Sequence, residues 1–149
     1  MRLALYQPEI PGNVGAMLRL AACLQVEVDI IEPCGFALSD ARMRRAGMDY
    51  IDHVSITRHP DWFAFLNSAV GRLVLLSTKA STMLHDFVFE EGDVLLLGRE
   101  SAGVPDAVRD ACAATVRIPI DPAVRSLNVA IAAGIGLAEA LRQTGRWPQ

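Results

Sequence analysis

Apolar residues occur along this chain in short runs that turn residues separate. The runs at residues 3–6, 26–31, 73–76, 93–97 and 115–118 have the length and the aliphatic, partly β-branched character of strands. Most of them contain few polar positions, which indicates strands that are buried on both faces of a sheet. A further short strand is predicted at residues 50–56.

Segments with helical character lie between these runs, and turn or capping residues bound most of them. Asn13 is a good N-cap, Pro60 and Pro105 suit the start of a helix, and Gly47 suits a helix end. Strands that alternate with helices predict an α/β fold, a mostly parallel sheet with helices on both faces, in one domain over residues 1–149. We expect helices over residues 13–24, 39–47, 60–66, 105–112 and 126–144.

The composition is that of a folded globular protein. Of the 149 residues, 52% are hydrophobic and 21% are charged, which allows one core and argues against disorder. No apolar run approaches the ~20 residues of a membrane span, and the apolar N-terminal stretch is too short for a signal peptide. We therefore expect a cytoplasmic protein. The widely spaced Cys23, Cys34 and Cys112 are typical of buried or half-buried thiols.

The charge balance limits how the chain could bind a nucleic acid. Its formal net charge is −3, so any contact with RNA must come from local basic patches and not from a uniformly basic surface. All basic residues except Lys79 are arginines. A guanidinium forms two-pronged hydrogen bonds with phosphates, although codon bias would produce the same composition.

Unusual polar residues follow three of the predicted strands, at the sheet edge where parallel α/β proteins bind ligands. After the first strand, residues 11–19 contain Gly15, where a backbone can approach a ligand closely. They also contain Arg19, a cation near the start of a helix whose dipole it opposes. A phosphate or an acidic partner would compensate that charge. An ordinary capped helix with a surface arginine is the alternative.

The second segment, residues 98–105, follows a buried strand and places the pair Arg99-Glu100 between two glycines. A loop of this kind can wrap a ligand with its backbone groups, and Glu100 could hold a cation or a ribose hydroxyl. A tight turn between a strand and a helix would have a similar composition.

In the third segment, two prolines stiffen the loop that leads to Ser126 and Asn128. We expect a helix to begin at Ser126, so that its free N–H groups can bind an anion or a carboxylate, with Asn128 in its first turn. Residues 129–138 are almost all small or aliphatic. We expect that helix to be buried on most faces, beneath the ligand loops or at a subunit interface.

The three histidines, His53, His59 and His85, lie outside these segments. Surface or hydrogen-bonded core positions are the interpretation we favour for them over a catalytic role. Aspartates and glutamates do not cluster with histidine or cysteine, so no metal site is predicted.

Taken together, the three segments resemble the three motifs of the SPOUT superfamily of RNA methyltransferases, and the match covers nearly the whole chain. Residues 5–15, 31–36 and 44–50 resemble one branch in particular. That branch contains the minimal tRNA (cytidine/uridine-2′-O)-methyltransferases, which act on the wobble nucleotide at position 34, a cytidine or a carboxymethylaminomethyluridine. The resemblance implies transfer of a methyl group from S-adenosyl-L-methionine to a ribose 2′-oxygen in the anticodon loop of tRNA.

The resemblance also implies a C-terminal trefoil knot, a homodimer and a set of site residues. By the family pattern, Leu76, Gly98, Ile118 and Ser126 bind the cofactor, largely through backbone atoms. Arg19, Glu100 and Asn128 would lie near the methyl-transfer site, where Arg19 would clamp a phosphate or stabilise an oxyanion, with a role as base left open. Contact with RNA is expected for Arg19, and contact with RNA or support of the dimer for Arg42, Arg44, Arg45 and Tyr50.

Two departures from the branch bear on the target nucleotide. Arg99 stands where the branch often has proline, and Val129-Ala130 stand where the branch often has Leu-Ser. The pair Val129-Ala130 looks more like the sister enzymes that act elsewhere on RNA. A 2′-O-methyltransferase for rRNA or for another tRNA site is therefore one alternative, and a non-catalytic RNA-binding module is another. A dehydrogenase is a third, but residues 11–15 lack the G-x-G-x-x-G spacing.

Overall fold

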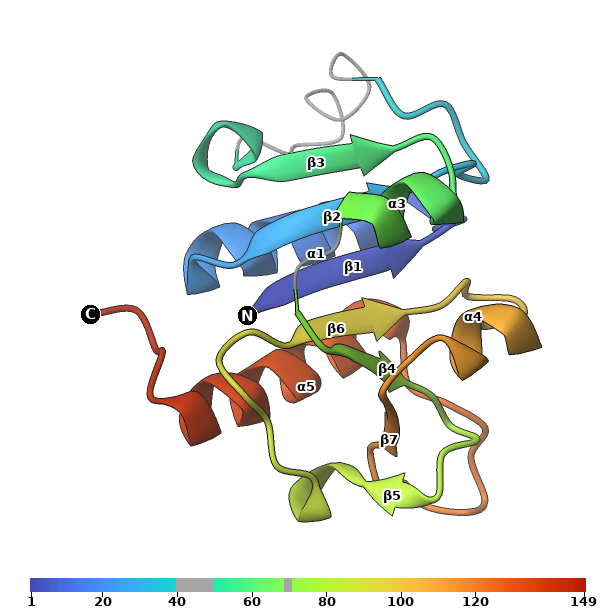
Figure 1. Ribbon diagram of the computed structural model, residues 1–149, viewed down its shortest axis with the longest axis vertical. Coiled ribbons are helices and arrows are strands. Elements are labelled where there is room, and N and C mark those ends of the chain that lie inside the picture. Colours follow the sequence, from blue (N-terminus) through green and yellow to red (C-terminus); the bar gives the residue numbers. More distant parts are fainter. Residues whose placement is uncertain (40–49, 69–70) are drawn as a thin grey trace.

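The computed structural model describes residues 1–39, 50–68 and 71–149. Seven strands form one sheet in the order β3-β2-β1-β6-β4-β7-β5, and every described pair of neighbouring strands is parallel (Figure 1). This confirms the predicted α/β fold with its parallel sheet. The strands are β1 (Arg2–Tyr6), β2 (Glu27–Ile31), β3 (Ile56–His59), β4 (Leu73–Leu76), β5 (Thr82–Met83), β6 (Val94–Leu97) and β7 (Ala114–Arg117).

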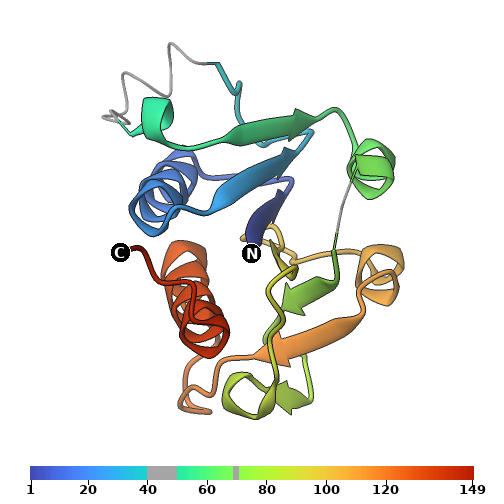
Figure 2. The same cartoon turned by 60° about the vertical axis from the view of Figure 1, so that its left-hand side comes forward.

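Helices cover both faces of the sheet, as the sequence predicts (Figure 2). Side chains alternate along each strand, so Leu3 and Leu5 of β1 pack beneath α1 and α5 while Ala4 and Tyr6 face α3 and α4. The helices are α1 (Pro11–Leu24), α3 (Trp62–Ser68), α4 (Asp106–Asp110) and α5 (Val129–Thr144), with 3₁₀ turns η1 (Ile51–His53) and η2 (Leu84–Asp86). None of the described helices is long and apolar enough to cross a membrane.

Two helix starts differ from the sequence prediction. The cap position of α1 is Ile10, followed by Pro11 in the first turn, so Asn13 is not the N-cap. The cap of α5 is Asn128, whose Oδ1 accepts hydrogen bonds from the backbone N–H groups of Ala130 and Ile131. The helix therefore does not begin at Ser126, and the predicted anion-binding N-terminus at that residue is wrong.

Two further segments were predicted wrongly or not at all. Residues 51–53 form η1, and β3 begins only at Ile56, where it pairs with Val28 of β2; a strand over residues 50–56 is therefore wrong. β5 has two residues that pair with the end of β7, and a strand of that length carries no periodic signal. The expected helix at 39–47 falls almost entirely outside the described residues.

The long helix α5 is less buried than its composition suggests. Gly136 lets the helix approach β6 so closely that a Cβ there would lie 2.9 Å from Leu95 Cδ2, while Leu137 and its neighbours on the same face belong to the core. On the opposite face Ile131 is 56% exposed and Ile135 is 39% exposed. The other residues of 129–138 are buried or half-buried, so the prediction of burial on most faces holds for a single copy except along this stripe.

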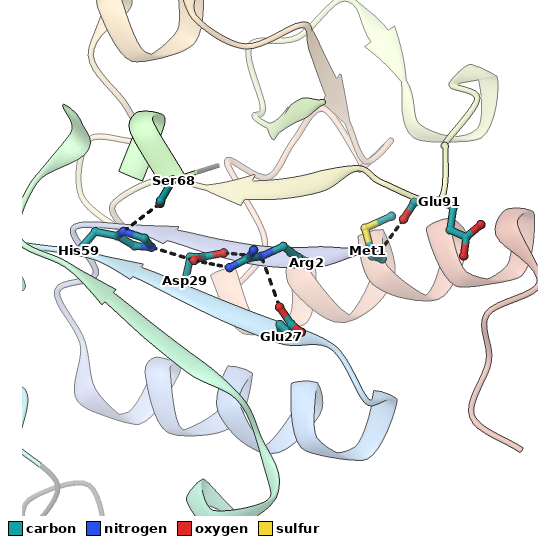
Figure 3. A network of polar contacts seen from close by, with 7 residues as sticks. All are labelled: Met1, Arg2, Glu27, Asp29, His59, Ser68 and Glu91. Carbon is teal, nitrogen blue, oxygen red and sulfur yellow. Dashed lines mark hydrogen bonds and ion pairs between the residues drawn. The ribbon is translucent and has the colours of Figure 1, made fainter. Parts of the chain in front are cut away.

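A buried ion-pair network joins β1, β2 and β3 beneath α3 (Figure 3). The Asp29 carboxylate accepts hydrogen bonds from Arg2 Nε and Nη2 at 2.9 and 2.7 Å, and its Oδ1 lies 2.8 Å from His59 Nε2. His59 Nδ1 lies 3.3 Å from Ser68 Oγ at the end of α3. His59 is therefore a hydrogen-bonded core histidine, as expected, while His53 and His85 are exposed.

The order of the strands creates a crevice at one edge of the sheet. β1 and β6 are neighbours, but the chain continues from β1 to α1 on one face and from β6 to α4 on the other. Loops that leave adjacent strands in opposite directions open a space outside the carboxyl ends of those strands. The three segments singled out from the sequence all lie at this edge.

Candidate functional site

A cavity of about 540 Å³ lies at the carboxyl ends of β4, β6 and β7. Its volume is within the usual range for pockets that hold small organic ligands, roughly 300–1,000 Å³. The four residues predicted to bind a cofactor all line it: Leu76 from β4, Gly98 after β6, Ile118 after β7 and Ser126 before α5. Glu100 and Asn128 line it too, so six of the predicted site residues converge.

The loop after β6 has a fixed shape that requires Gly98. The backbone N–H of Arg99 donates to the Gly103 carbonyl at 3.0 Å, and the Gly103 N–H donates back at 2.9 Å. These bonds fold residues 98–103 so tightly that a Cβ at Gly98 would lie 2.6 Å from the carbonyl carbon of Gly103. The glycine therefore serves the loop's own fold, and the cavity wall depends on it.

A chain of hydrogen bonds ties the three loops together. Glu100 Oε1 accepts from Asn13 Nδ2 at 3.1 Å, and Glu100 Oε2 accepts from the backbone N–H of Glu9 at 2.9 Å. Asn13 Oδ1 in turn accepts from Asn128 Nδ2 at 3.0 Å. Glu100 and Asn128, which the sequence placed together only through the family resemblance, are thus joined through Asn13.

The donor-to-acceptor direction of this series of hydrogen bonds is fixed at both ends. A carboxylate only accepts hydrogen bonds and a backbone N–H only donates them, so Asn13 must present its NH₂ to Glu100. Asn128 must present its oxygen to the N–H of Ala130. The one consistent arrangement therefore orients both amides at the rim of the cavity.

Glu9 is a site residue that the sequence reasoning missed. Its carboxylate accepts from the Ser101 N–H at 2.8 Å and from Ser101 Oγ at 2.7 Å. Hydrogen bonds from Ser101 hold the pKa of Glu9 below its usual 4.5, and the bond from the hydroxyl contributes more than the bond from the backbone N–H. Its position between Pro8 and Ile10, just after a strand, was the available signal.

Arg19 is not brought to the cavity of its own chain. It lies in the middle of α1 and is exposed, and its guanidinium carbon is 4.7 Å from the centre of the Tyr50 ring. That distance is typical of a cation–π contact. Arg19 and Tyr50 thus form a pair outside the cavity, while Arg42, Arg44 and Arg45 lie outside the described residues.

The cavity lining is electrostatically positive although the chain is acidic overall. Four cationic side chains line it, namely Lys79, Arg99, Arg109 and Arg125, against the carboxylates of Glu100 and Asp106. A lining with this balance favours a ligand that carries an anionic group.

The remaining reactive side chains play no evident part at this edge. Burial raises the pKa of the Cys34 and Cys112 thiols to about 11, so neither is a thiolate at neutral pH; Cys23, expected to be at least half-buried, is exposed. Within the described parts of the chain, no group of three or more His, Cys, Asp or Glu residues could hold a metal ion.

Comparison with known sequences places nearly all of the chain in one family. Residues 1–138 match the SpoU rRNA Methylase family. A tRNA (cytidine(34)-2'-O)-methyltransferase of Beijerinckia indica is 59% identical over 146 residues, which cover 96% of this chain and 91% of that protein.

Solved structures of RNA methyltransferases have the same fold as this chain. One, described as structural insights into the 2-OH methylation of C/U34 on tRNA, is 42% identical with a TM-score of 0.89 and covers 95% of this chain and 94% of that one. An AdoMet-bound rRNA methyltransferase from Sinorhizobium meliloti is 28% identical with a TM-score of 0.84. It covers 95% of this chain and 55% of that longer one.

These likenesses confirm the resemblance predicted from the three loops, including the branch it favoured. They also confirm that the fold is that of SpoU methyltransferases and that the cofactor is S-adenosylmethionine. The chain belongs to the SpoU rRNA Methylase family.

Proposed function

We propose that this chain transfers a methyl group from S-adenosylmethionine to the ribose 2′-oxygen of nucleotide 34 of tRNA, a cytidine or a carboxymethylaminomethyluridine. The observation that carries the proposal is the convergence of Gly98, Glu100 and Asn128 on one cavity, with Glu100 and Asn128 joined there through hydrogen bonds to Asn13. The relatives named as acting on position 34 support the target.

The cavity suits the cofactor by size and by the chemistry of its lining. Leu76 and Ile118 offer apolar contact to a nucleoside, and the backbone around Gly98 and the hydroxyl of Ser126 offer hydrogen bonds. When bound, S-adenosylmethionine supplies an electrophilic methyl group on a positively charged sulfur. The chain's own contribution is to hold the acceptor ribose in line, and orientation of this kind can lower a barrier by ~7–11 kcal/mol.

Glu100 and Asn128 are the residues that this proposal places beside the ribose. Each oxygen of Glu100 accepts one hydrogen bond from the chain, and a carboxylate oxygen has room for another. A 2′-hydroxyl can therefore donate to Glu100 without breaking the loops apart. Asn128, oriented by its cap bonds, completes the rim against which the nucleotide is held.

Arg19 acts, in this proposal, on the RNA from the outer surface of α1. Its guanidinium is exposed and stacked over Tyr50, an arrangement that leaves donors for a phosphate while the ring limits the side chain's freedom. Arg42 and Arg45 belong to the same proposed RNA surface by sequence. Because Arg19 does not line the cavity of its own chain, a direct role at the reacting oxygen would require the cavity of a second copy.

A homodimer would bring such a cavity within reach. Leu127, Ile131 and Ile135 are exposed at the start of α5, and Ile10 is exposed beside α1, so this surface has the apolar character of an interface. We propose that two copies pair here, in the cytoplasm, and that the pair grips the anticodon loop, whose unpaired bases are open to recognition.

The C-terminal trefoil knot is also part of the proposal. β6 lies between β1 and β4, and α5 returns from the far side of the sheet to pack on α1 and β6. A chain that threads its C-terminal part through an earlier loop would make these neighbours and would bring the loops around the cavity together.

Labelled S-adenosylmethionine and a tRNA transcript test the function directly. We expect one methyl group per tRNA, mapped by nuclease digestion to nucleotide 34, and no incorporation when that nucleotide is a 2′-deoxynucleotide. Label recovered in rRNA, or at another tRNA position, would contradict the target. Binding of the tRNA with no transfer would support the non-catalytic alternative.

Arg19→Ala tests the assignment of Arg19. We expect transfer to fall by about 100-fold, with unchanged calorimetric affinity for S-adenosylhomocysteine because Arg19 does not line the cavity. The exposed Arg146, which pairs with Glu91 before the start of β6, provides a control as Arg146→Ala. Near-normal transfer by Arg19→Ala would exclude Arg19 from the mechanism.

A further inference from the structure

Arg99 has an unusual position in the cavity wall. It lines the cavity between Gly98 and Glu100, and its backbone is pinned by the pair of hydrogen bonds to Gly103. A long cationic side chain in a rigid loop calls for a physical explanation.

The guanidinium is partly buried without a full set of partners. Its carbon lies 6.0 Å from the centre of the Tyr6 ring, at the outer limit of a cation–π contact. Its Nε is buried and has no hydrogen-bond partner, and among the described residues no other buried side-chain nitrogen or oxygen lacks one. A buried donor left unpaired is costly, most of all on a charged group.

The carboxylates nearest in the chain are bonded elsewhere. Both oxygens of Glu9 accept from Ser101, and both oxygens of Glu100 accept from the backbone of Glu9 and from Asn13. Neither carboxylate accepts a hydrogen bond from Arg99 Nε, although the charge of Arg99 helps to lower the pKa of Glu9.

A second arginine of the same cavity shows the contrast. Arg109 also lines it, but its guanidinium is paired with Asp106 at 2.8 Å and bonded to Asp110 at 3.1–3.2 Å. An arginine in this wall can thus be satisfied within the chain, and Arg99 Nε is not.

We propose that Arg99 binds an oxyanion of a ligand in this cavity, and that its guanidinium turns on binding so that Nε, which is enclosed in the ligand-free chain, faces the ligand. A guanidinium edge forms two parallel hydrogen bonds with a carboxylate or a phosphate. The inference rests on the proposed function, which supplies two sources of such a group: the carboxylate of the cofactor's amino-acid end and a backbone phosphate of the RNA. Either source would satisfy the orphaned donor, and the experiment below separates them.

The test uses two variants of Arg99 and one matched control. Arg99→Met keeps the apolar stem and removes all donors, and Arg99→Lys keeps the charge and removes Nε. The control Arg146→Met removes an arginine that pairs with Glu91 and does not line the cavity. Calorimetry measures the affinity of each for S-adenosylhomocysteine, which carries the carboxylate, and for 5′-methylthioadenosine, which lacks it. A filter-binding titration with an anticodon stem–loop RNA at several salt concentrations measures the second source.

If the carboxylate is the ligand, Arg99→Met lowers the affinity for S-adenosylhomocysteine by about tenfold and leaves the affinity for 5′-methylthioadenosine unchanged. If a phosphate is the ligand, both nucleosides bind normally, RNA binding weakens by about tenfold, and the salt slope falls by about 1. Arg99→Lys should recover only part of either loss, and Arg146→Met should show neither.

A stability measurement separates ligand binding from a structural role. An arginine that supports the fold destabilises the protein when it is replaced, whereas removal of an orphaned buried donor does not. We therefore expect the Tm of ligand-free Arg99→Met to equal or exceed that of the wild type. Wild-type affinities for all three ligands with no change in Tm, or a drop in Tm as the sole effect, would overturn the proposal.

The wild-type protein provides the separate check on the proposed function. If it binds S-adenosylhomocysteine and methylates tRNA while Arg99→Met binds every ligand equally well, the function stands and the role of Arg99 fails. If the wild type binds no S-adenosylhomocysteine, the proposed function fails, and the RNA titration alone decides whether Arg99 binds an anion.

Discussion

Two polar networks in this molecule use similar groups in opposite environments. The first joins Arg2, Asp29 and His59 inside the sheet, where Asp29 is 1% exposed and His59 is 4% exposed. The second joins Glu100, Asn13 and Asn128 at the rim of the cavity, where the side chains are partly or fully exposed. Both connect segments far apart in the sequence.

The difference shows how burial decides what a polar network can do. A buried carboxylate must be paired on every side, because an uncompensated charge there costs several kcal/mol, and it has nothing left for a ligand. At the rim, water satisfies spare lone pairs, so Glu100 can hold the loops and still accept another hydrogen bond. The first network therefore stabilises the fold, and the second can also bind a ligand.

The largest effect is expected from breaking the buried network. Asp29→Ala leaves Arg2 and His59 without their shared partner, and we expect a loss of about 3 kcal/mol in the free energy of unfolding. Urea denaturation measures that loss. Affinity for S-adenosylhomocysteine at a temperature where the variant is folded should stay at the wild-type value.

The control for this variant is the exposed partner of the same arginine. Glu27 lies 3.7 Å from Arg2 Nε and its side chain is 59% exposed, so Glu27→Ala should cost below about 1 kcal/mol. Equal losses for the two variants would show that burial does not distinguish the networks as we argue.

The next effect concerns the loop that carries Glu100. Gly98→Val forces a side chain into the space of the Gly103 backbone, and the Arg99–Gly103 bridge must open. We expect the affinity for S-adenosylhomocysteine to fall by about 100-fold, or ~2.7 kcal/mol, in calorimetry. Gly92→Ala, where a Cβ meets nothing within 4 Å, is the control. An unchanged affinity in Gly98→Val would remove the assignment of this cavity to the cofactor.

The scaffold was predictable because buried parallel strands leave a strong signal. Runs such as residues 73–76 and 94–97 were located to within a residue, since almost every position in them is apolar. The loops after these strands could then be placed at one edge by topology alone. Convergence of Gly98 and Glu100 on one cavity follows from that placement.

The details of the site were less predictable because they depend on partners distant in sequence. Asn13 has the residue type of an N-cap, but Pro11 already begins the helix and the Glu100 carboxylate binds the Asn13 amide. Ser126 was expected to begin α5, a role that Asn128 takes because its Oδ1 reaches two N–H groups. The sequence also gave no sign that α1 would carry Arg19 away from the cavity.

A smaller effect is expected from removing the central member of the rim network. Asn13→Ala breaks the bonds to Glu100 and Asn128 but leaves their positions exposed to water, so the loss of stability should be about 1 kcal/mol. Methyl transfer should suffer more, with kcat down by about tenfold because the loops are no longer held in register.

The comparison variant is the exposed Asn67 of α3, on the other face of the sheet. Asn67→Ala should change neither stability nor kcat. If Asn13→Ala destabilises the protein as strongly as Asp29→Ala while kcat holds, the rim network is structural and the contrast between the two networks fails.

The smallest effect is a pH dependence at the rim. Hydrogen bonds from Ser101 lower the pKa of Glu9 below 4.5, so the folded state favours the ionised form. The resulting stability is present above about pH 4.5 and is lost as the pH falls through the lowered pKa. Glu9→Gln lacks this ionisation, so its deficit relative to the wild type in urea denaturation should be constant from pH 7 to about pH 5.5 and should shrink toward pH 3. In a Ser101→Ala background, which removes the largest cause of the shift, the pH-dependent part of that deficit should shrink. A deficit that is the same at pH 3 and pH 7 would mean that Glu9 supports the loop by shape and not by charge.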